Sequence, residues 1–122
     1  MLKYETNAPI YLQVVDAIKL DIINGKLKAG DKLPSGRDLA IQYTINPNTA
    51  ARVYQELERQ EICFTKRGMG TFVTEDHQKI IECRKQMADE TLHRFLIGLK
   101  ELGITKEEAI EMINEANDIC LI

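Results

Sequence analysis

Apolar residues recur at helical spacing near the start of the chain. Four of them lie four positions apart: Ile10, Val14, Ile18 and Ile22. This spacing predicts one apolar face of an amphipathic helix. Pro9 suits the first position of that helix, because its missing N–H would have no partner there. Gly25 is the expected left-handed residue that ends it.

Two further short helices are predicted, each beginning at a capping residue. Pro34-Ser35 opens the first, where the Ser35 side chain can accept a hydrogen bond from the amide of Asp38. Asn46-Pro47 opens the second, with Asn46 as the N-cap and Pro47 as the first helical residue. Inward-facing apolar residues then repeat at helical spacing: Ala50, Val53, Tyr54 and Leu57.

A hairpin is predicted after these helices. Residues 62–65 and 71–74 are short apolar and β-branched runs that favour strands. Residues 66–70 join them with the sequence Lys-Arg-Gly-Met-Gly, so the tip is basic and rich in glycine. From about Asp76 the pattern is helical again to about Glu101, and Gly103 is expected to end this helix. A last helix follows, with Thr105 as its expected N-cap.

These elements predict a mainly α fold with a small β-hairpin. A winged helix-turn-helix domain is expected over residues 1–75, followed by a two-helix C-terminal tail over residues 76–122. The helix, turn, capped helix and basic hairpin occur in this order within forty-odd residues, and that order favours the winged helix more than any single feature does.

Charge is distributed unevenly along the chain. The net charge is -3. Residues 1–75 carry ten basic against nine acidic residues, whereas the remainder carries six against ten. The acidity therefore belongs to the tail, and the N-terminal part can bind phosphate if its cations converge on one face.

Several classes of protein are disfavoured by composition. No apolar run approaches the roughly 18 residues of a membrane span, and no signal peptide pattern opens the chain, so a cytoplasmic location and no membrane partner are expected. The cysteines are expected to be free thiols: Cys63, Cys83 and Cys120. Neither histidine belongs to a metal or catalytic motif, so we expect no cofactor, no metal and no enzyme activity.

The start of the third helix suits DNA. The B-DNA major groove admits an α-helix, whose N-terminal residues reach the base edges first. Asn48 can pair with adenine, the Thr49 methyl can contact a thymine methyl, and Arg52 can reach a guanine or a phosphate. Arg37, in the first turn of the second helix, can bind a backbone phosphate. Double-stranded DNA is therefore the expected partner.

The hairpin tip offers a second DNA contact. Lys66 and Arg67 can lie along phosphates or enter the minor groove, and Gly68 and Gly70 let the backbone approach closely. Each feature also has a structural interpretation: Arg37 in a surface ion pair, Asn46 to Thr49 as a well-capped helix start, and the hairpin tip as a solvated turn. Asn46 completes the candidate DNA-binding set.

The sequence resembles the GntR family of bacterial transcription regulators over roughly residues 4–74. The residues that carry the resemblance are the segments 9–13, 25–37 and 46–49, then Arg52, 54–58 and 67–73. The resemblance implies DNA contacts by a specific set: Arg37, Asn48, Thr49, Arg52, Lys66, Arg67 and Gly68. It also implies an operator with inverted-repeat symmetry.

The short helical tail is similar to that of the YtrA subfamily. The resemblance implies that such a tail serves mainly for dimerisation, and that the regulated genes encode membrane transporters. The family has glycine where Thr44 and Glu61 stand here, so positive φ at either position would be strained by roughly 1 kcal/mol.

Apolar positions in the tail favour a homodimer, because two helices alone cannot bury them all. The candidate dimerisation residues are Met87, Thr91, Leu92, Phe95, Leu96, Leu99, Met112 and Ile113. The alternative is a tail that folds back onto its own N-terminal domain.

The function predicted is a sequence-specific transcription regulator, most simply a homodimeric repressor, with any small-molecule effector unknown. The rival hypothesis is a protein-interaction module that uses the winged-helix scaffold without reading DNA.

Overall fold

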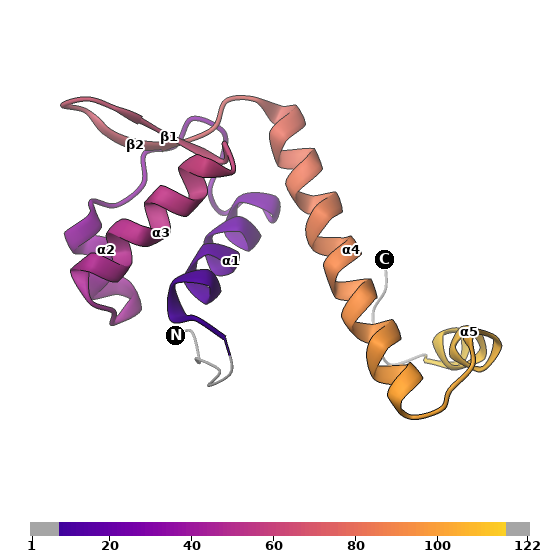
Figure 1. Ribbon diagram of the computed structural model, residues 1–122. Helices are drawn as coiled ribbons and strands as arrows, with labels where there is room; N and C mark the ends of the chain where they lie inside the picture. The colour runs from indigo at the N-terminus through magenta and orange to yellow at the C-terminus, as the bar shows by residue number, and fades with distance from the viewer. Residues whose placement is uncertain (1–7, 117–122) are drawn as a thin grey trace. The chain divides into compact units, whose positions relative to one another are not determined.

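The structure, a computed structural model, describes residues 8–116 and contains five helices and one hairpin within them (Figure 1). The elements are α1 (Ile10–Ile23), α2 (Gly36–Tyr43), α3 (Pro47–Arg59), β1 (Cys63–Lys66), β2 (Gly70–Val73), α4 (His77–Glu101) and α5 (Lys106–Glu115). The chain forms two compact units, Met1–Lys85 and Gln86–Ile122, which divide inside α4. The mainly helical fold with a two-stranded hairpin confirms the predicted fold class.

Helix α1 begins one residue later than predicted. Pro9 has ψ 134° and is the N-cap, and its carbonyl accepts a hydrogen bond from the amide of Gln13 at 3.3 Å. Pro9 therefore supplies the first carbonyl acceptor of the helix, and Ile10 is the first helical residue. Gly25 has φ +80°, so the predicted left-handed end is confirmed. Of the predicted apolar face, Ile10 is 46% exposed, while the three later members are buried.

The caps of α2 and α3 form as predicted. The Ser35 hydroxyl accepts from the amide of Asp38 at 3.1 Å. The Asn46 side-chain oxygen accepts from the amide of Asn48 at 2.8 Å, and Pro47 is the first residue of α3. Each cap satisfies a backbone donor that the helix itself cannot, which fixes where the helix starts.

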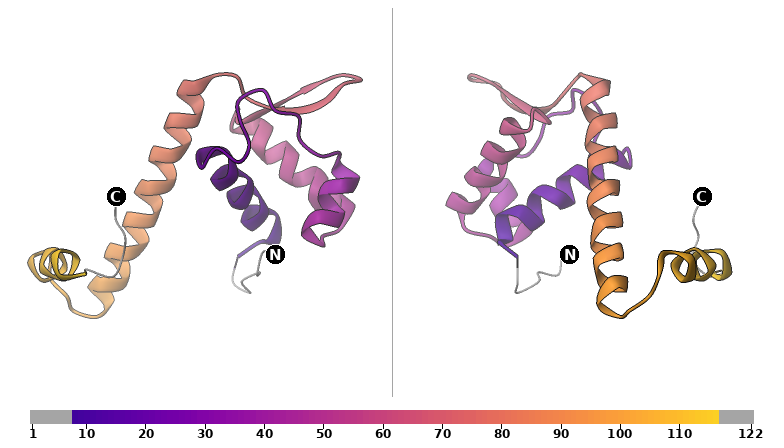
Figure 2. Two further views of the ribbon diagram at one scale, coloured as in Figure 1. Left: turned by 180° about the vertical axis from the view of Figure 1, so that it is seen from behind. Right: turned by 45° about the vertical axis from the view of Figure 1, so that its right-hand side comes forward.

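The core of the N-terminal unit lies between α1, α2 and α3 (Figures 1 and 2). Its fully buried large side chains are Val14, Val15, Leu39, Val53, Leu57 and Val73. The Tyr54 hydroxyl donates to the carbonyl of Pro34 at 2.5 Å, which ties α3 to the residues that precede α2. Burial raises the pKa of Tyr54 above its usual range, so this hydroxyl keeps its proton.

The hairpin strands pair antiparallel from Cys63↔Val73 to Lys66↔Gly70. The predicted strands are shifted: β1 begins and ends one residue later than expected, and β2 one residue earlier. The pairing therefore extends to Lys66 and Gly70 and leaves a shorter tip. A segment before α2 also joins this sheet, because Lys32 bridges to Phe72 and the Leu33 amide donates to the Thr71 carbonyl at 2.8 Å.

Two non-glycine residues among those described have a left-handed backbone conformation. Thr44 has φ 55° at the end of α2, and Glu61 has φ 60° before β1. The strain expected at these two positions is therefore present. The Glu61 carboxylate also pairs with the Lys79 ammonium at 2.7 Å.

Replacing Thr44 with glycine will stabilise the protein. The left-handed conformation costs a non-glycine residue about 1–2 kcal/mol, and glycine loses about 0.5–1 kcal/mol more in backbone entropy on folding, so the net gain is about 0.5–1 kcal/mol. Urea unfolding measures it. Gln42→Gly, on the last turn of α2, is the matched control and will destabilise by about 1 kcal/mol. Equal destabilisation by both changes would show that Thr44 is not strained.

The C-terminal part of α4 and α5 form the second unit. Gly103, with φ +73°, follows α4, and a capping box of Thr105 and Glu108 opens α5. Both features agree with the predicted helix end and N-cap. Ala109 is the only buried residue that the structure describes in this unit. No helix among the described residues is both long and apolar enough to cross a membrane.

Candidate nucleic-acid interface

The first turn of α3 presents polar side chains at the surface. Asn48 is exposed and Thr49 is half-buried, while Ala50 is fully buried and anchors the turn to the core. The side-chain oxygen of Asn46 caps the helix, so this oxygen is already engaged within the protein. Asn48 and Thr49 are therefore the side chains of this turn that remain available to a base edge.

Arg52 lies one turn after Asn48 on the exposed side of α3. Its guanidinium lies over the ring of Tyr11, with Cζ 3.9 Å from the ring centroid. Tyr11 is half-buried in the first turn of α1, and α1 packs against α3. The aromatic ring thus holds the arginine from a second helix, which the sequence pattern did not indicate.

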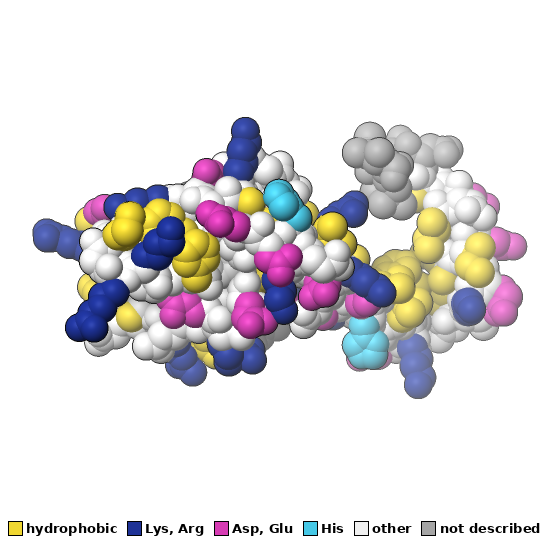
Figure 3. All heavy atoms as spheres, turned by 90° about the horizontal axis from the view of Figure 1, so that it is seen from above, with side chains coloured by type: hydrophobic (Ala, Val, Ile, Leu, Met, Phe, Trp, Pro, Cys, Tyr) yellow, Lys and Arg dark blue, Asp and Glu magenta, His cyan; other side chains and the backbone are white. Residues whose placement is uncertain are grey.

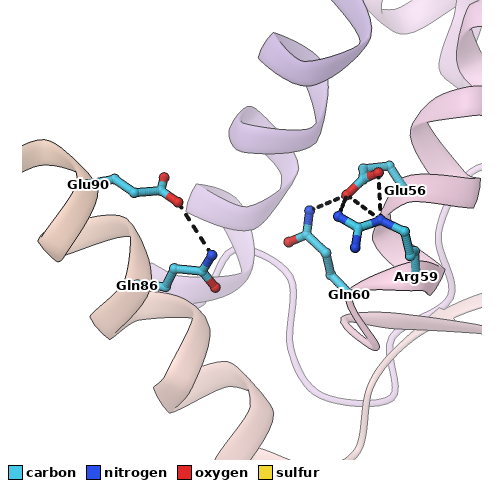
Figure 4. A network of polar contacts seen from close by, with 5 residues as sticks. All are labelled: Glu56, Arg59, Gln60, Gln86 and Glu90. Atoms are coloured by element: carbon cyan, nitrogen blue, oxygen red, sulfur yellow. Dashed lines mark hydrogen bonds and ion pairs between the residues drawn. The ribbon is translucent and has the colours of Figure 1, made fainter.

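Arg59, also exposed on α3, is engaged by an acidic neighbour. Its Nε donates to the two carboxylate oxygens of Glu56 at 3.0 and 3.1 Å, and Gln60 donates to the same carboxylate at 2.7 Å (Figure 4). The hydrogen bonds from Arg59 and Gln60 lower the pKa of Glu56 to about 2. The charge of Arg59 is therefore matched locally, and Arg52 is the better candidate for a DNA contact.

The hairpin of β1 and β2, residues 63–73, is the wing of the fold. It carries its cations above a pair of stacked aromatic rings. Phe64 and Phe72 stack across β1 and β2 with ring centroids 5.7 Å apart. The Lys66 ammonium lies 5.7 and 5.5 Å from the centroids of these rings. Arg67 and Gly68 are exposed at the tip, where Gly68 has φ +80°. Figure 3 shows Lys and Arg side chains around apolar side chains at the end of the surface where the hairpin lies.

A groove of about 650 Å³ separates the wing from the start of α2. Residues of both elements line it, including Lys32, Ser35, Gly36, Lys66, Gly70 and Thr71. Arg37, the second residue of α2, is exposed beside this stretch. The groove thus joins the wing and α2, the two elements predicted to contact phosphates.

Lys32 is a candidate that sequence reasoning missed. Its side chain crosses the wing at Gly70, where an added Cβ would lie 2.9 Å from Lys32 Cε. Gly70 also has φ +121°, a backbone angle that favours glycine. The only sequence feature that could have indicated this role is the turn at Gly30-Asp31, which aligns Lys32 with β2.

The described residues offer little support for a metal site or a reactive cysteine. They contain no group of three or more His, Cys, Asp and Glu side chains arranged to hold a metal ion. Burial, with Glu58 nearby, raises the pKa of the Cys63 thiol to about 12, so this cysteine is unreactive near neutral pH. Cys83 is also buried and forms no disulfide, and Cys120 lies outside the described residues.

The predicted dimerisation residues lie on α4 and α5. Met87 and Leu99 are half-buried, and the others are exposed: Thr91, Leu92, Phe95, Leu96, Met112 and Ile113. Three exposed apolar neighbours were not in the predicted set: Ile97, Leu102 and Ile110. The second unit therefore presents a broad apolar surface in the single chain.

Three helices, a capped third helix with exposed polar residues and a basic wing define a winged helix-turn-helix DNA-binding protein. The profile of the bacterial regulatory proteins of the gntR family matches residues 10–73. The chain therefore belongs to the GntR family of transcription regulators, and to its YtrA subfamily.

Some relatives match over nearly their whole length. The chain is 44% identical over 111 residues to the HTH-type transcriptional regulator YhcF of Bacillus subtilis (strain 168), covering 91% of this chain and 92% of that protein. It is 38% identical to the HTH-type transcriptional repressor YtrA of the same organism, covering 90% and 85%. A GntR family regulator from Listeria monocytogenes superposes with a TM-score of 0.85 at 38% identity, covering 93% and 100%. The chain is thus a DNA-binding transcription regulator, and the interaction-module hypothesis is not favoured.

Proposed function

We propose that this regulator acts as a homodimeric repressor that binds an inverted-repeat operator with α3 in the major groove. The observation that carries the proposal is the exposed polar start of α3 beside a basic wing. Asn48, Thr49 and Arg52 read base edges, as their side-chain chemistry allows. Repression is supported by the relative YtrA of Bacillus subtilis, which is a transcriptional repressor.

Phosphate contacts come from the elements that flank the reading helix. Arg37 binds a backbone phosphate at the start of α2, and the wing contributes Lys66, Arg67 and the closely approaching backbone of Gly68. Asn46 contributes mainly by fixing the start of α3, since its side chain caps the helix. Lys32 adds a cation in the groove between the wing and α2.

The tail assembles the dimer through its apolar surface. In the single chain Leu92 is 53% exposed, Leu96 45% and Ile113 44%. An exposed apolar surface on a two-helix unit favours association with the same surface of a second copy of the chain. Two-fold symmetry would then place two reading helices on successive turns of DNA. Sedimentation at micromolar concentration tests the assembly, and a purely monomeric species would contradict it.

Selection from a random-sequence duplex library tests the proposed function directly. We expect enrichment of an inverted repeat, bound at least about 10³-fold more tightly than a shuffled duplex at physiological salt. Affinity for both duplexes should fall steeply as salt rises. Failure to enrich any sequence would contradict sequence-specific recognition.

Lys66→Ala and Lys32→Gln will weaken binding to all duplexes about equally. Each removes one phosphate contact, so each should reduce the slope of log K against log salt by about 1 without changing sequence preference. Fluorescence anisotropy over a salt series measures this slope. Lys26→Gln is the matched control, because it removes the same charge from an exposed site that does not line the groove. A slope change equal to the control's would exclude Lys32 as a phosphate contact.

The regulated genes are proposed to encode a membrane transporter, and the protein is proposed to act at the nucleoid in the cytoplasm. Support comes from the subfamily alone. A reporter fused to the promoter of the regulator's own operon tests repression, since deleting the regulator should raise expression. Calorimetry with candidate small molecules tests for an effector.

A further inference from the structure

The contact between Arg52 and Tyr11 joins the reading helix to α1. Arg52 Cζ lies 3.9 Å from the Tyr11 ring centroid, within the roughly 6 Å range in which a cation is attracted to an aromatic face. Tyr11 is half-buried and Arg52 exposed. The ring is therefore anchored, while the guanidinium keeps an open side for another partner.

Among residues 8–116, no carboxylate forms an ion pair with Arg52. Within residues 8–116, the ion pairs join Arg59 to Glu56 and Lys79 to Glu61, and neither involves Arg52. The two exposed arginines of α3 are thus held in different ways. Glu56 neutralises Arg59, whereas the ring of Tyr11 restrains Arg52 without a carboxylate from the described residues.

Restraint of this kind favours binding. A free arginine side chain samples many rotamers, and ordering it on DNA costs conformational entropy. A side chain already held against an aromatic ring loses less freedom when it meets a base or a phosphate. An aromatic partner achieves this without the charge neutralisation that a carboxylate would bring.

We propose that Tyr11 is a positioning residue that holds Arg52 ready for DNA, so that α1 contributes to sequence recognition without itself contacting a base. The inference rests on the proposed role of α3 as the reading helix. It predicts that the chemistry needed at position 11 is an aromatic face, and that the hydroxyl is dispensable.

Two variants of the full chain separate the aromatic face from simple packing. Tyr11→Leu keeps apolar bulk but removes the ring, and Tyr11→Phe keeps the ring. With the enriched duplex and its shuffled counterpart, Tyr11→Leu should lose about 2- to 5-fold in discrimination, as expected for one exposed cation–aromatic contact. Tyr11→Phe should match the wild type. Leu20→Ala, on the exposed side of α1, is the control and should also match it.

A double-mutant cycle and NMR complete the test. In the Arg52→Ala background, Tyr11→Leu should cause no further loss, because the group it positions is gone. Without DNA, the Arg52 side-chain protons should show an upfield ring-current shift in the wild type and in Tyr11→Phe, and lose it in Tyr11→Leu. Thermal unfolding reports whether each variant folds.

The outcomes distinguish this inference from the proposed function. If Tyr11→Leu discriminates like the wild type while Arg52→Ala does not, the positioning role is wrong and the reading helix stands. If Tyr11→Leu and Arg52→Ala lose discrimination additively, Tyr11 acts through another group and the inference is overturned. If the wild type itself does not discriminate between duplexes, both ideas fail, whatever the ring-current shift shows.

Discussion

Replacing Arg52 with alanine will lower affinity for the cognate operator by about 1–3 kcal/mol, the value of one good base contact. Discrimination against a shuffled duplex will fall with it, because nonspecific binding depends on phosphate contacts elsewhere. Anisotropy titrations of both duplexes at one salt concentration measure the two effects.

Arg59→Ala is the matched control for this prediction. Arg59 lies on the same helix and carries the same charge, but Glu56 binds its guanidinium. An exposed pair of this kind contributes little to stability, so the variant should fold and should retain sequence discrimination. Equal losses for Arg52→Ala and Arg59→Ala, or no loss for Arg52→Ala, would show that the reading residue is misassigned.

If the tail forms the proposed dimer, placing two carboxylates on its apolar surface will convert that dimer to a monomer. Leu92→Glu with Leu96→Glu puts like charges one turn apart on α4, where both leucines are exposed in the single chain. Desolvating these carboxylates in an apolar interface is strongly unfavourable. A monomer has only one winged helix-turn-helix domain. Its operator affinity should therefore be lower by about 100-fold or more, while its affinity for a single half-site stays unchanged.

Arg94→Glu is the control for the tail. It adds the same side chain two residues after Leu92, on the opposite side of the helix. This variant should sediment and bind like the wild type if Leu92 and Leu96 form the interface. A wild-type-like dimer in the double variant would place the interface at other predicted residues, such as Phe95, or exclude the tail from it.

Local chemistry made much of the N-terminal unit predictable. The caps at Ser35 and Asn46 follow from a side-chain oxygen placed to accept a nearby amide, and both form. The left-handed backbone at Thr44 could be expected from the glycine of the family. These features depend on neighbours within a few residues, so sequence order is sufficient to locate them.

Contacts between distant segments were not predictable in the same way. The Tyr11–Arg52 pair depends on how α1 packs on α3, and Lys32 meets Gly70 only because the segment before α2 pairs with β2. Strand ends were misplaced by one residue for a related reason, since pairing across the hairpin extends the ladder into residues that look like a turn.

The tail shows the limit of pattern analysis. Its helices, the glycine after α4 and the cap at Thr105 were predicted from the sequence. Helical periodicity predicted the dimerisation residues, but most of them are exposed in the single chain, so neither the pattern nor burial identifies which of them form the interface. The domain boundary at residue 75 and the dimerisation residues stay predictions.

Hydroxyl-radical footprinting on the enriched duplex tests the central claim most directly. If α3 and the wing read DNA from a two-fold symmetric dimer, the protected positions will form two equal groups related by a dyad and centred about 10–10.5 base pairs, or a multiple of this, apart. Uniform cleavage at low salt, or a single group without symmetry, would contradict that claim.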